Sequence, residues 1–222
     1  MKKLNEMRIE KRLTSSFRIT TMITSVAAIA AILVLLIISS RYTYALRYFG
    51  FAQGDIGQAI ILFTDARGDT RAIVGYDDQS VISNLVSQFD EDKEGFTSKW
   101  KEVEAVLVTD ETKSTYQAIN DKLQDYWALN EEIIELGKTV SDKASRQQAQ
   151  SKAMNELAPA YEEIDSLMYE LLNEKTSRGE SLDNTLNITT YILVVAAVIV
   201  LVISFNISVR FGRFIARGIA EP

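Results

Sequence analysis

The sequence predicts an all-α protein, in which an antiparallel four-helix-bundle extracytoplasmic domain is flanked by two transmembrane helices. Three observations predict this fold class. Two long uncharged stretches lie near the ends of the 222-residue chain, the polar segment between them repeats apolar residues at helical spacing, and only two prolines occur. Because proline removes a helical hydrogen bond and crowds the preceding turn, its scarcity favours long helices.

The first uncharged stretch covers residues 19–40 and is bounded by Arg18 and Arg41. About 20 apolar residues cross the hydrocarbon core of a bilayer as a helix, so this stretch predicts the first transmembrane helix. A cleaved signal peptide is the alternative, because residues 1–18 form a basic lead-in. The apolar core exceeds the roughly 7–15 residues of a signal peptide, and no small-residue cleavage site follows Ser40, which favours a retained helix.

The second uncharged stretch runs from Asn184 to Val209, and residues 189–209 predict the second transmembrane helix. Basic residues flank the outer ends of both stretches: Lys2, Lys3, Arg8, Lys11, Arg12, Arg18, Arg210, Arg213 and Arg217. Positive flanks face the cytoplasm, so both termini are predicted inside and residues 41–188 outside. The outer segment holds 27 acidic and 15 basic residues, and its net negative charge argues against nucleic-acid binding.

Segment 41–188 contains four stretches in which apolar residues recur three or four positions apart, the pattern of helices that bury one face. The apolar positions are Tyr44, Tyr48, Phe51, Ile56, Ile60, Phe63, Ile73 and Val74 in the first stretch, Leu85, Phe89, Phe96, Trp100, Val103 and Leu107 in the second, Tyr116, Ile119, Leu123, Tyr126 and Ile133 in the third, and Met154, Leu157, Tyr161, Ile164, Met168 and Leu171 in the fourth. Breaks at residues 75–78, 109–111 and 137–144 are as short as helical bundles require.

Three features modify this pattern. Ser145 followed by Gln148 fits a capping box at the start of the fourth helix. Pro159 lies inside that helix and predicts either a kink or a later helix start. Asn130 interrupts the apolar face of the third helix, where it sets the register of packing, is exposed, or binds a ligand.

Composition excludes several kinds of site. The chain has no Cys and no His, which removes disulfides, thiolate metal sites and imidazole acid–base chemistry. No nucleophile–base pair, Gly-rich phosphate loop or metal-ligand spacing is present, so neither enzyme activity nor a cofactor is expected. The acidic run formed by Asp90, Glu91, Asp92 and Glu94 is predicted to be a solvated helix face, because a metal site needs ligands that converge around a turn.

Three segments carry a resemblance to a known family. The start, MRIEKRLTSSFRIT, is a basic amphipathic lead-in; DARGDTRAIVG places arginines near the distal end of the first outer helix; and FGRFIARGIAEP ends with the Ile-x-x-Pro pattern of Ile219 to Pro222. With the two-span topology, the chain resembles bacterial methyl-accepting chemotaxis receptors that have a four-helix-bundle ligand-binding domain. Residues 210–222 resemble the start of a cytoplasmic HAMP linker, so we expect the output region to follow Pro222.

The resemblance implies a homodimeric receptor in the lipid bilayer that senses an extracellular small molecule for chemotaxis and transmits a helix displacement. The implied ligand is a carboxylate or an amino acid, or a ligand-loaded binding protein. Arg67 and Arg71, four positions apart, share a helix face, and arginines at this height hold the ligand carboxylate in the family. Gln148, Ser151 and Asn155, at the start of the fourth helix, are implied to complete the site.

Each of these expectations has an alternative. Arg67 and Arg71 would belong to a solvated face if they paired with Asp69, Asp77 or Asp78, and the polar residues of the fourth helix would then form an ordinary helix start. The bundle also resembles the sensor half of some histidine kinases and cyclic-dinucleotide enzymes, so the chain could be the sensor portion of a histidine kinase or diguanylate cyclase. A non-sensing membrane adaptor that binds another protein is a further alternative.

Overall fold

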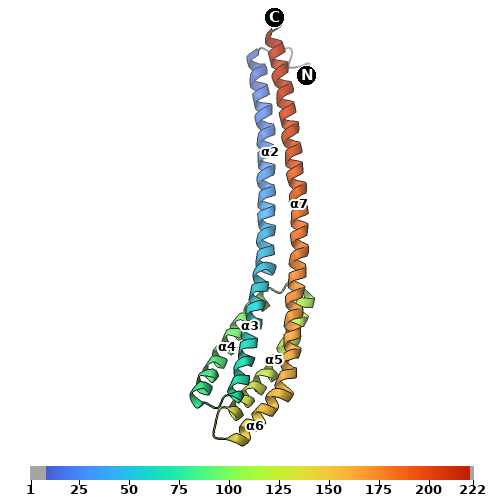
Figure 1. Ribbon diagram of the computed structural model, residues 1–222. Coiled ribbons are helices and arrows are strands. Elements are labelled where there is room, and N and C mark those ends of the chain that lie inside the picture. The colour runs from blue at the N-terminus through green and yellow to red at the C-terminus, as the bar shows by residue number, and fades with distance from the viewer. Residues whose placement is uncertain (1–8, 221–222) are drawn as a thin grey trace. The chain divides into compact units, whose positions relative to one another are not determined.

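The structure, a computed structural model, describes residues 9–220 and is helical there except at the connections 76–78, 106–109 and 138–142 (Figure 1). The predicted lead-in at residues 1–8 and the last two residues of the HAMP-like ending, Glu221 and Pro222, lie outside this range. Contacts divide the chain into two compact units. We call residues 44–181 the bundle unit, and the residues up to Thr43 and from Leu182 onward the apolar unit.

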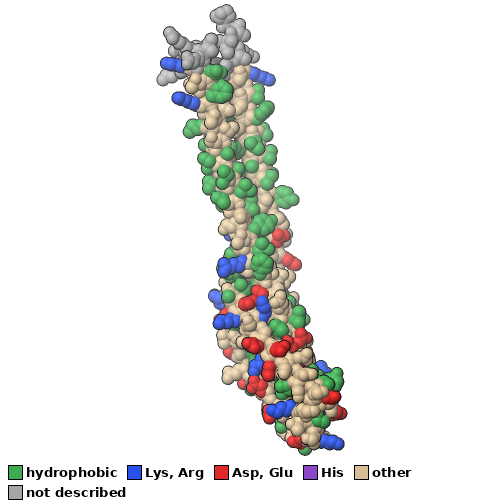
Figure 2. Space-filling model, turned by 90° about the vertical axis from the view of Figure 1, so that its left-hand side faces the viewer, with side chains coloured by type: hydrophobic (Ala, Val, Ile, Leu, Met, Phe, Trp, Pro, Cys, Tyr) green, Lys and Arg blue, Asp and Glu red, His purple; other side chains and the backbone are tan. Residues whose placement is uncertain are grey.

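The apolar unit contains most of α2 (Ile9–Ala45) and the later part of α7 (Ala158–Ala220). Figure 2 shows hydrophobic side chains over the visible face of the apolar unit, whereas charged side chains concentrate over the bundle unit. Two helices, Leu13–Gly75 and Lys143–Arg213, are long and apolar enough to cross a membrane, and 0% and 6% of their most apolar windows are buried. The predicted spans 19–40 and 189–209 lie inside these helices, which makes both candidate membrane spans.

The bundle unit contains the predicted four helices. The first three are α3 (Phe51–Gly75), α4 (Gln79–Ala105) and α5 (Asp110–Gly137), and the π-helical turn η1 (Leu46–Gly50) precedes α3. The fourth helix consists of α6 (Lys143–Lys152), the π-helical turn η2 (Ala153–Leu157) and the first part of α7. Within residues 9–220 there is no strand. The all-helical fold class and the four-helix bundle are therefore confirmed, and the breaks between helices fall within three residues of their predicted positions.

Side-chain caps explain where these helices begin. Asp78 precedes α4 and accepts hydrogen bonds from the backbone amides of Ser80 and Val81, which with the Ser80 hydroxyl hold the pKa of Asp78 below its usual value. Asp142 caps α6 in the same way by accepting from the amide of Ser145. The capping box predicted from Ser145 and Gln148 is wrong, because the carboxylate three residues before Ser145 is the acceptor that starts the helix.

The fourth helix departs from the predicted spacing at η2. Four buried residues follow one another at intervals of four positions: Ala149, Ala153, Leu157 and Tyr161. This spacing is longer than the α-helical period of about 3.6 residues per turn. The π-helical turn absorbs this excess, and the amide of Ala158 donates to the carbonyl of Ala153, five residues back. The fourth helix begins at Lys143, so the later start considered for Pro159 is wrong. Near the proline the helix instead contains a π-helical turn, which ends two residues before Pro159.

Three apolar residues assigned to the buried faces are exposed. Met154 is 75% exposed because the π-helical turn places Ala153 on the buried face instead. In the first stretch Tyr44 and Phe51 are 41% and 66% exposed, whereas Ala52 is fully buried. Small alanines continue the face set by the larger residues, and a pattern search for large apolar residues passes over them.

Two buried cations bind the carbonyl groups at the ends of the bundle helices. The guanidinium of Arg146, whose residue is 6% exposed, donates to the carbonyl oxygens of Gly137 (2.7 Å), Val74 (3.3 Å), Ile73 (3.4 Å) and Tyr76 (2.5 Å). These carbonyls lie at the C-termini of α3 and α5. The last carbonyls of a helix lack intrahelical partners and carry the negative end of its dipole, so a cation there stabilises both helix ends.

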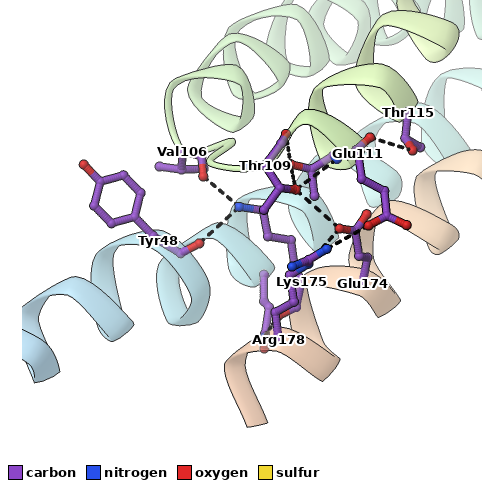
Figure 3. Close-up of polar contacts among 10 residues, drawn as sticks. Tyr48, Val106, Thr109, Glu111, Thr115, Glu174, Lys175 and Arg178 are labelled. Carbon is purple, nitrogen blue, oxygen red and sulfur yellow. Dashed lines mark hydrogen bonds and ion pairs between the residues drawn. The ribbon is translucent and has the colours of Figure 1, made fainter. Parts of the chain in front are cut away.

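Lys175 binds backbone carbonyl groups at the other end of the bundle unit (Figure 3). It is fully buried, and its Nζ donates to the carbonyl oxygens of Val106, 2.7 Å away, and Tyr48, 3.3 Å away. Burial lowers the pKa of Lys175, and within the described residues its ammonium group donates to these two carbonyl oxygens and to no carboxylate. The lysine therefore joins the end of α4, the turn η1 and α7 through neutral acceptors.

Candidate functional site

A cavity of about 380 Å³ lies between α3 and the fourth helix of the bundle unit. It is lined by Arg67, Arg71, Val74, Gly75, Gln150, Ala153, Met154, Leu157 and Ala158. The two arginines come from one face of α3, one turn apart, and the opposite wall comes from α6, η2 and the first residue of α7. The π-helical turn η2 thus forms part of this wall and sets which side chains of the fourth helix reach the cavity.

Arg67 is held in place by the fourth helix. Its guanidinium carbon lies 3.7 Å from the centre of the Tyr161 ring, and its Nη2 is 3.2 Å from Oε1 of Glu162. A guanidinium over an aromatic ring is attracted by the ring's negative face. The partners considered from the sequence, Asp69, Asp77 and Asp78, are not the ones that bind Arg67.

Arg71 is exposed and makes no ion pair with any residue that the structure describes. The aspartates considered as its partners are engaged elsewhere: Asp77 lies 3.4 Å from Arg146, and Asp78 caps α4. The guanidinium of Arg71 therefore keeps its donors available at the rim of the cavity.

The polar residues expected from the fourth helix lie apart from the arginines. Gln148, Ser151 and Asn155 are exposed and do not line the cavity, and Ser151 accepts a hydrogen bond from Nδ2 of Asn155 at 3.2 Å. Gln150 takes their place, and its Nε2 donates to the carbonyl of Val74 at 2.8 Å. Sequence reasoning missed Gln150, although its spacing from Ala153 and Leu157 places it on the cavity face.

The lining suits binding of a small anion that carries an apolar group. Val74, Ala153 and Leu157 give the cavity apolar walls, and the two guanidinium groups give it a positive rim. A guanidinium presents planar paired donors that match the two oxygens of a carboxylate. The lining residues contain no nucleophile paired with a base, so the arrangement supports binding.

A second cavity, of about 570 Å³, lies between α3 and α4 and has a different character. It is lined by Thr64, Asp65, Gly68, Asp69, Gln88, Glu91 and Asp92. Burial, together with the negative charge of Asp92, raises the pKa of Asp69 to about 6. Glu91 is exposed, as predicted for a solvated helix face, whereas the prediction is wrong for Asp92, which is half-buried beside Asp69. In the described range no group of three or more acidic residues is arranged to hold a metal ion.

Asn130 is fully buried between α5 and α3. Its Oδ1 accepts from the hydroxyl of Thr70 at 2.8 Å, and its Nδ2 donates to the carbonyl of Tyr126 at 2.8 Å. The exposed alternative for Asn130 is therefore wrong. A buried polar pair is satisfied only when the two helices keep one register, which is the role that Asn130 and Thr70 fit.

A family model described as a four helix bundle sensory module for signal transduction matches residues 6–190. The match covers α2, the helices α3, α4 and α5, and the fourth helix of the bundle unit as far as the beginning of the second uncharged stretch. No curated protein and no solved structure matches the chain.

Proposed function

The chain belongs to the four-helix-bundle sensory modules of methyl-accepting chemotaxis proteins, and on this basis we propose that it is a transmembrane chemoreceptor. In this proposal the bundle unit lies outside the cell, both termini lie in the cytoplasm, and two copies form a homodimer in the bilayer. The receptor binds a small molecule, directly or through a binding protein, and transmits the signal for chemotaxis without catalysing a reaction. The observation that carries the proposal is the cavity between α3 and the fourth helix, with Arg71 unpaired at its rim.

The ligand class follows from the charges at this cavity. Arg71 offers free paired donors, and Arg67 adds a second positive charge that Tyr161 and Glu162 hold in position. The apolar walls favour a ligand with a hydrocarbon portion, so an amino acid or a small carboxylic acid fits the chemistry. Gln148, Ser151 and Asn155 do not line the cavity of one chain, and in this proposal they would contact a ligand only at the edge of the site.

Transmission would use the fourth helix. The helix Lys143–Arg213 includes both the cavity wall and the second candidate membrane span. A ligand that bridges α3 and the fourth helix would favour one of two packings of α7, with a displacement of about 1–2 Å along the helix. Coupling of this kind typically amounts to about 1–3 kcal/mol between the ligand site and the output.

Replacing Arg71 with Ala is expected to weaken carboxylate binding about 10- to 100-fold, because hydrogen bonds to charged groups contribute about 1.5–3 kcal/mol. The measurement is a screen of amino acids and small carboxylic acids by thermal shift, followed by calorimetry, on the full chain in lipid nanodiscs. A ligand that binds only the folded state raises its stability. Arg71→Lys should retain part of the affinity, since an ammonium group keeps the charge but loses the planar pair of donors.

Lys113→Ala is the matched control, because Lys113 is an exposed cation on α5 that does not line the cavity. This variant should bind as the wild type does. The ligand proposal fails if no carboxylate stabilises the wild-type chain, or if Arg71→Ala binds the same ligand with unchanged affinity.

The topology has a direct test, because the chain contains no native cysteine. Asp110→Cys, at the exposed start of α5, should react with a membrane-impermeant maleimide added to intact cells, or to spheroplasts if an outer membrane blocks access. Lys11→Cys, which lies before the first candidate span, should react only after the cells are opened. Protection of position 110, or labelling of position 11 from outside, would contradict the proposed orientation.

A further inference from the structure

The acidic cavity between α3 and α4 contains a carboxylate oxygen that lacks a partner. Oδ2 of Asp69 is buried and accepts no hydrogen bond from any described donor. Buried polar atoms in folded proteins almost always have a hydrogen-bond partner, and leaving a charged one without a partner costs free energy. An ionised Asp69 is therefore poorly accommodated at this position.

The groups around Asp69 make its ionised form less favourable still. Asp65 lies on the same helix, and Glu91 and Asp92 face it from α4. No lysine or arginine lines the cavity. The nearest cation along α4, Lys93, is bound instead to Glu131 of α5 and lies 5.7 Å from the centre of the Trp127 ring.

Protonation of one carboxylate provides a hydrogen-bond partner for Oδ2 of Asp69 and reduces the repulsion between the neighbouring carboxylates. Asp69 and Asp92 line the same cavity, and Asp92 raises the pKa of Asp69. Two carboxylates can share a hydrogen bond only when one of them is protonated. A proton on Asp69 would give Oδ2 a partner, and it would remove one of two adjacent negative charges. Pairs of carboxylates that share a site in this way hold one proton well above the ordinary pH of aspartate titration.

We propose that Asp69 and Asp92 bind one proton between them and thereby make the bundle unit sensitive to the acidity of the surrounding solution. The proton joins α3 to α4 when the solution is mildly acidic, and its loss places two negative charges in the cavity and loosens the contact between the helices. The proposal requires no ligand at the cavity of Arg67 and Arg71. Acidity would be a second stimulus. It would act at the cavity between α3 and α4, whereas the ligand would bind at the cavity between α3 and the fourth helix.

The direction of the pH effect follows from linkage. The pKa of Asp69 is raised from 3.8 to about 6 in the folded chain, which corresponds to about 100-fold tighter proton binding than in the unfolded chain. Folding therefore takes up a proton between about pH 4 and pH 6. The stability that this proton contributes is fully present below about pH 4 and is lost as the pH rises through about 6.

The test uses the full chain in lipid nanodiscs at pH values between 4.5 and 7.5. Infrared spectroscopy should show the carboxyl stretching band of a protonated aspartate that appears on acidification with a midpoint near pH 6. Asp69→Asn should abolish this band and flatten the rise of the unfolding temperature on acidification. Asp92→Asn should do the same, because its amide would donate to an ionised Asp69 and return that carboxyl towards its ordinary titration range.

Asp90→Asn is the matched control, since Asp90 is an exposed carboxylate on α4 outside the cavity. It should keep both the band and the wild-type pH profile. The asparagine variants remove a negative charge from an acidic cavity, so they are expected to fold. The proposal is overturned if the band persists in Asp69→Asn, or if that variant, Asp90→Asn and the wild type show the same dependence of unfolding temperature on pH.

Discussion

Replacing Arg146 with Met is expected to destabilise the bundle unit by about 3–5 kcal/mol, because a buried acceptor left without its donor costs about 1–3 kcal/mol and several carbonyl oxygens lose theirs. Methionine fills similar space but removes the guanidinium donor of the carbonyls of Gly137, Ile73 and Tyr76. The carbonyl of Val74 keeps its hydrogen bond from Gln150. Those carbonyls end α3 and α5, so both helix ends should loosen together. Urea unfolding of the full chain in nanodiscs, followed by circular dichroism, measures the change.

Arg146→Lys should recover only part of this loss, because the ammonium group lacks the planar fork with which the guanidinium of Arg146 donates to four carbonyl oxygens. Lys101→Met is the control, since Lys101 is an exposed cation on α4 and surface substitutions usually change stability by less than about 0.5 kcal/mol. A loss below about 1 kcal/mol for Arg146→Met would show that water satisfies the carbonyls, contrary to the prediction.

Replacing Phe63 with Ala is expected to cost about 3–5 kcal/mol, the range found for fully buried phenylalanines. Phe63 is fully buried, and its ring centre lies 4.8 Å from that of Tyr126, 5.1 Å from that of Tyr161 and 5.6 Å from that of Phe96. The lost ring leaves a cavity at the point where all four helices meet. Denaturant unfolding of the same preparation gives the magnitude.

Phe51→Ala is a matched control on the same helix, because its side chain is 66% exposed in the described part of the chain. It should change the free energy of unfolding by less than about 0.5 kcal/mol. Equal losses for the two variants would mean that the side chain of Phe63 is not at the centre of the core, and that α3 packs in the bundle with a different face inward.

The helices and their central contacts were predictable because they depend on periodic apolar residues. Phe63, Tyr126, Tyr161 and Phe96 all come from the apolar positions of the four predicted stretches, and all are buried. The breaks were predictable for a related reason, since Asp78 and Thr109 are residues that start helices by accepting from backbone amides. Local chemistry and one-dimensional spacing are sufficient for features of this kind.

Features that depend on contacts between distant segments were not predictable. Arg146 and Lys175 have the sequence character of solvated cations, and their burial depends on which helix ends meet them in space. The approach of Asp92 to Asp69 depends on the rotation of α4 against α3. The candidate ligand site was predictable in part. The spacing of Arg67 and Arg71 indicates that they share a helix face. Gln150 lines the cavity in place of Gln148 because the face that the fourth helix presents depends on η2.

The π-helical turn η2 has a consequence for how the chain can change in length. Because it accommodates one surplus residue, it separates the register of α6, which packs Arg146 and Ala149, from that of α7, which packs Tyr161 and Met168. Deleting one exposed residue there, such as Asn155, would convert the turn to ordinary α-helix while both flanking faces stay inward. Insertions and deletions of single residues among related proteins should therefore collect at this turn, where evolution can alter the wall of the cavity without rebuilding the core.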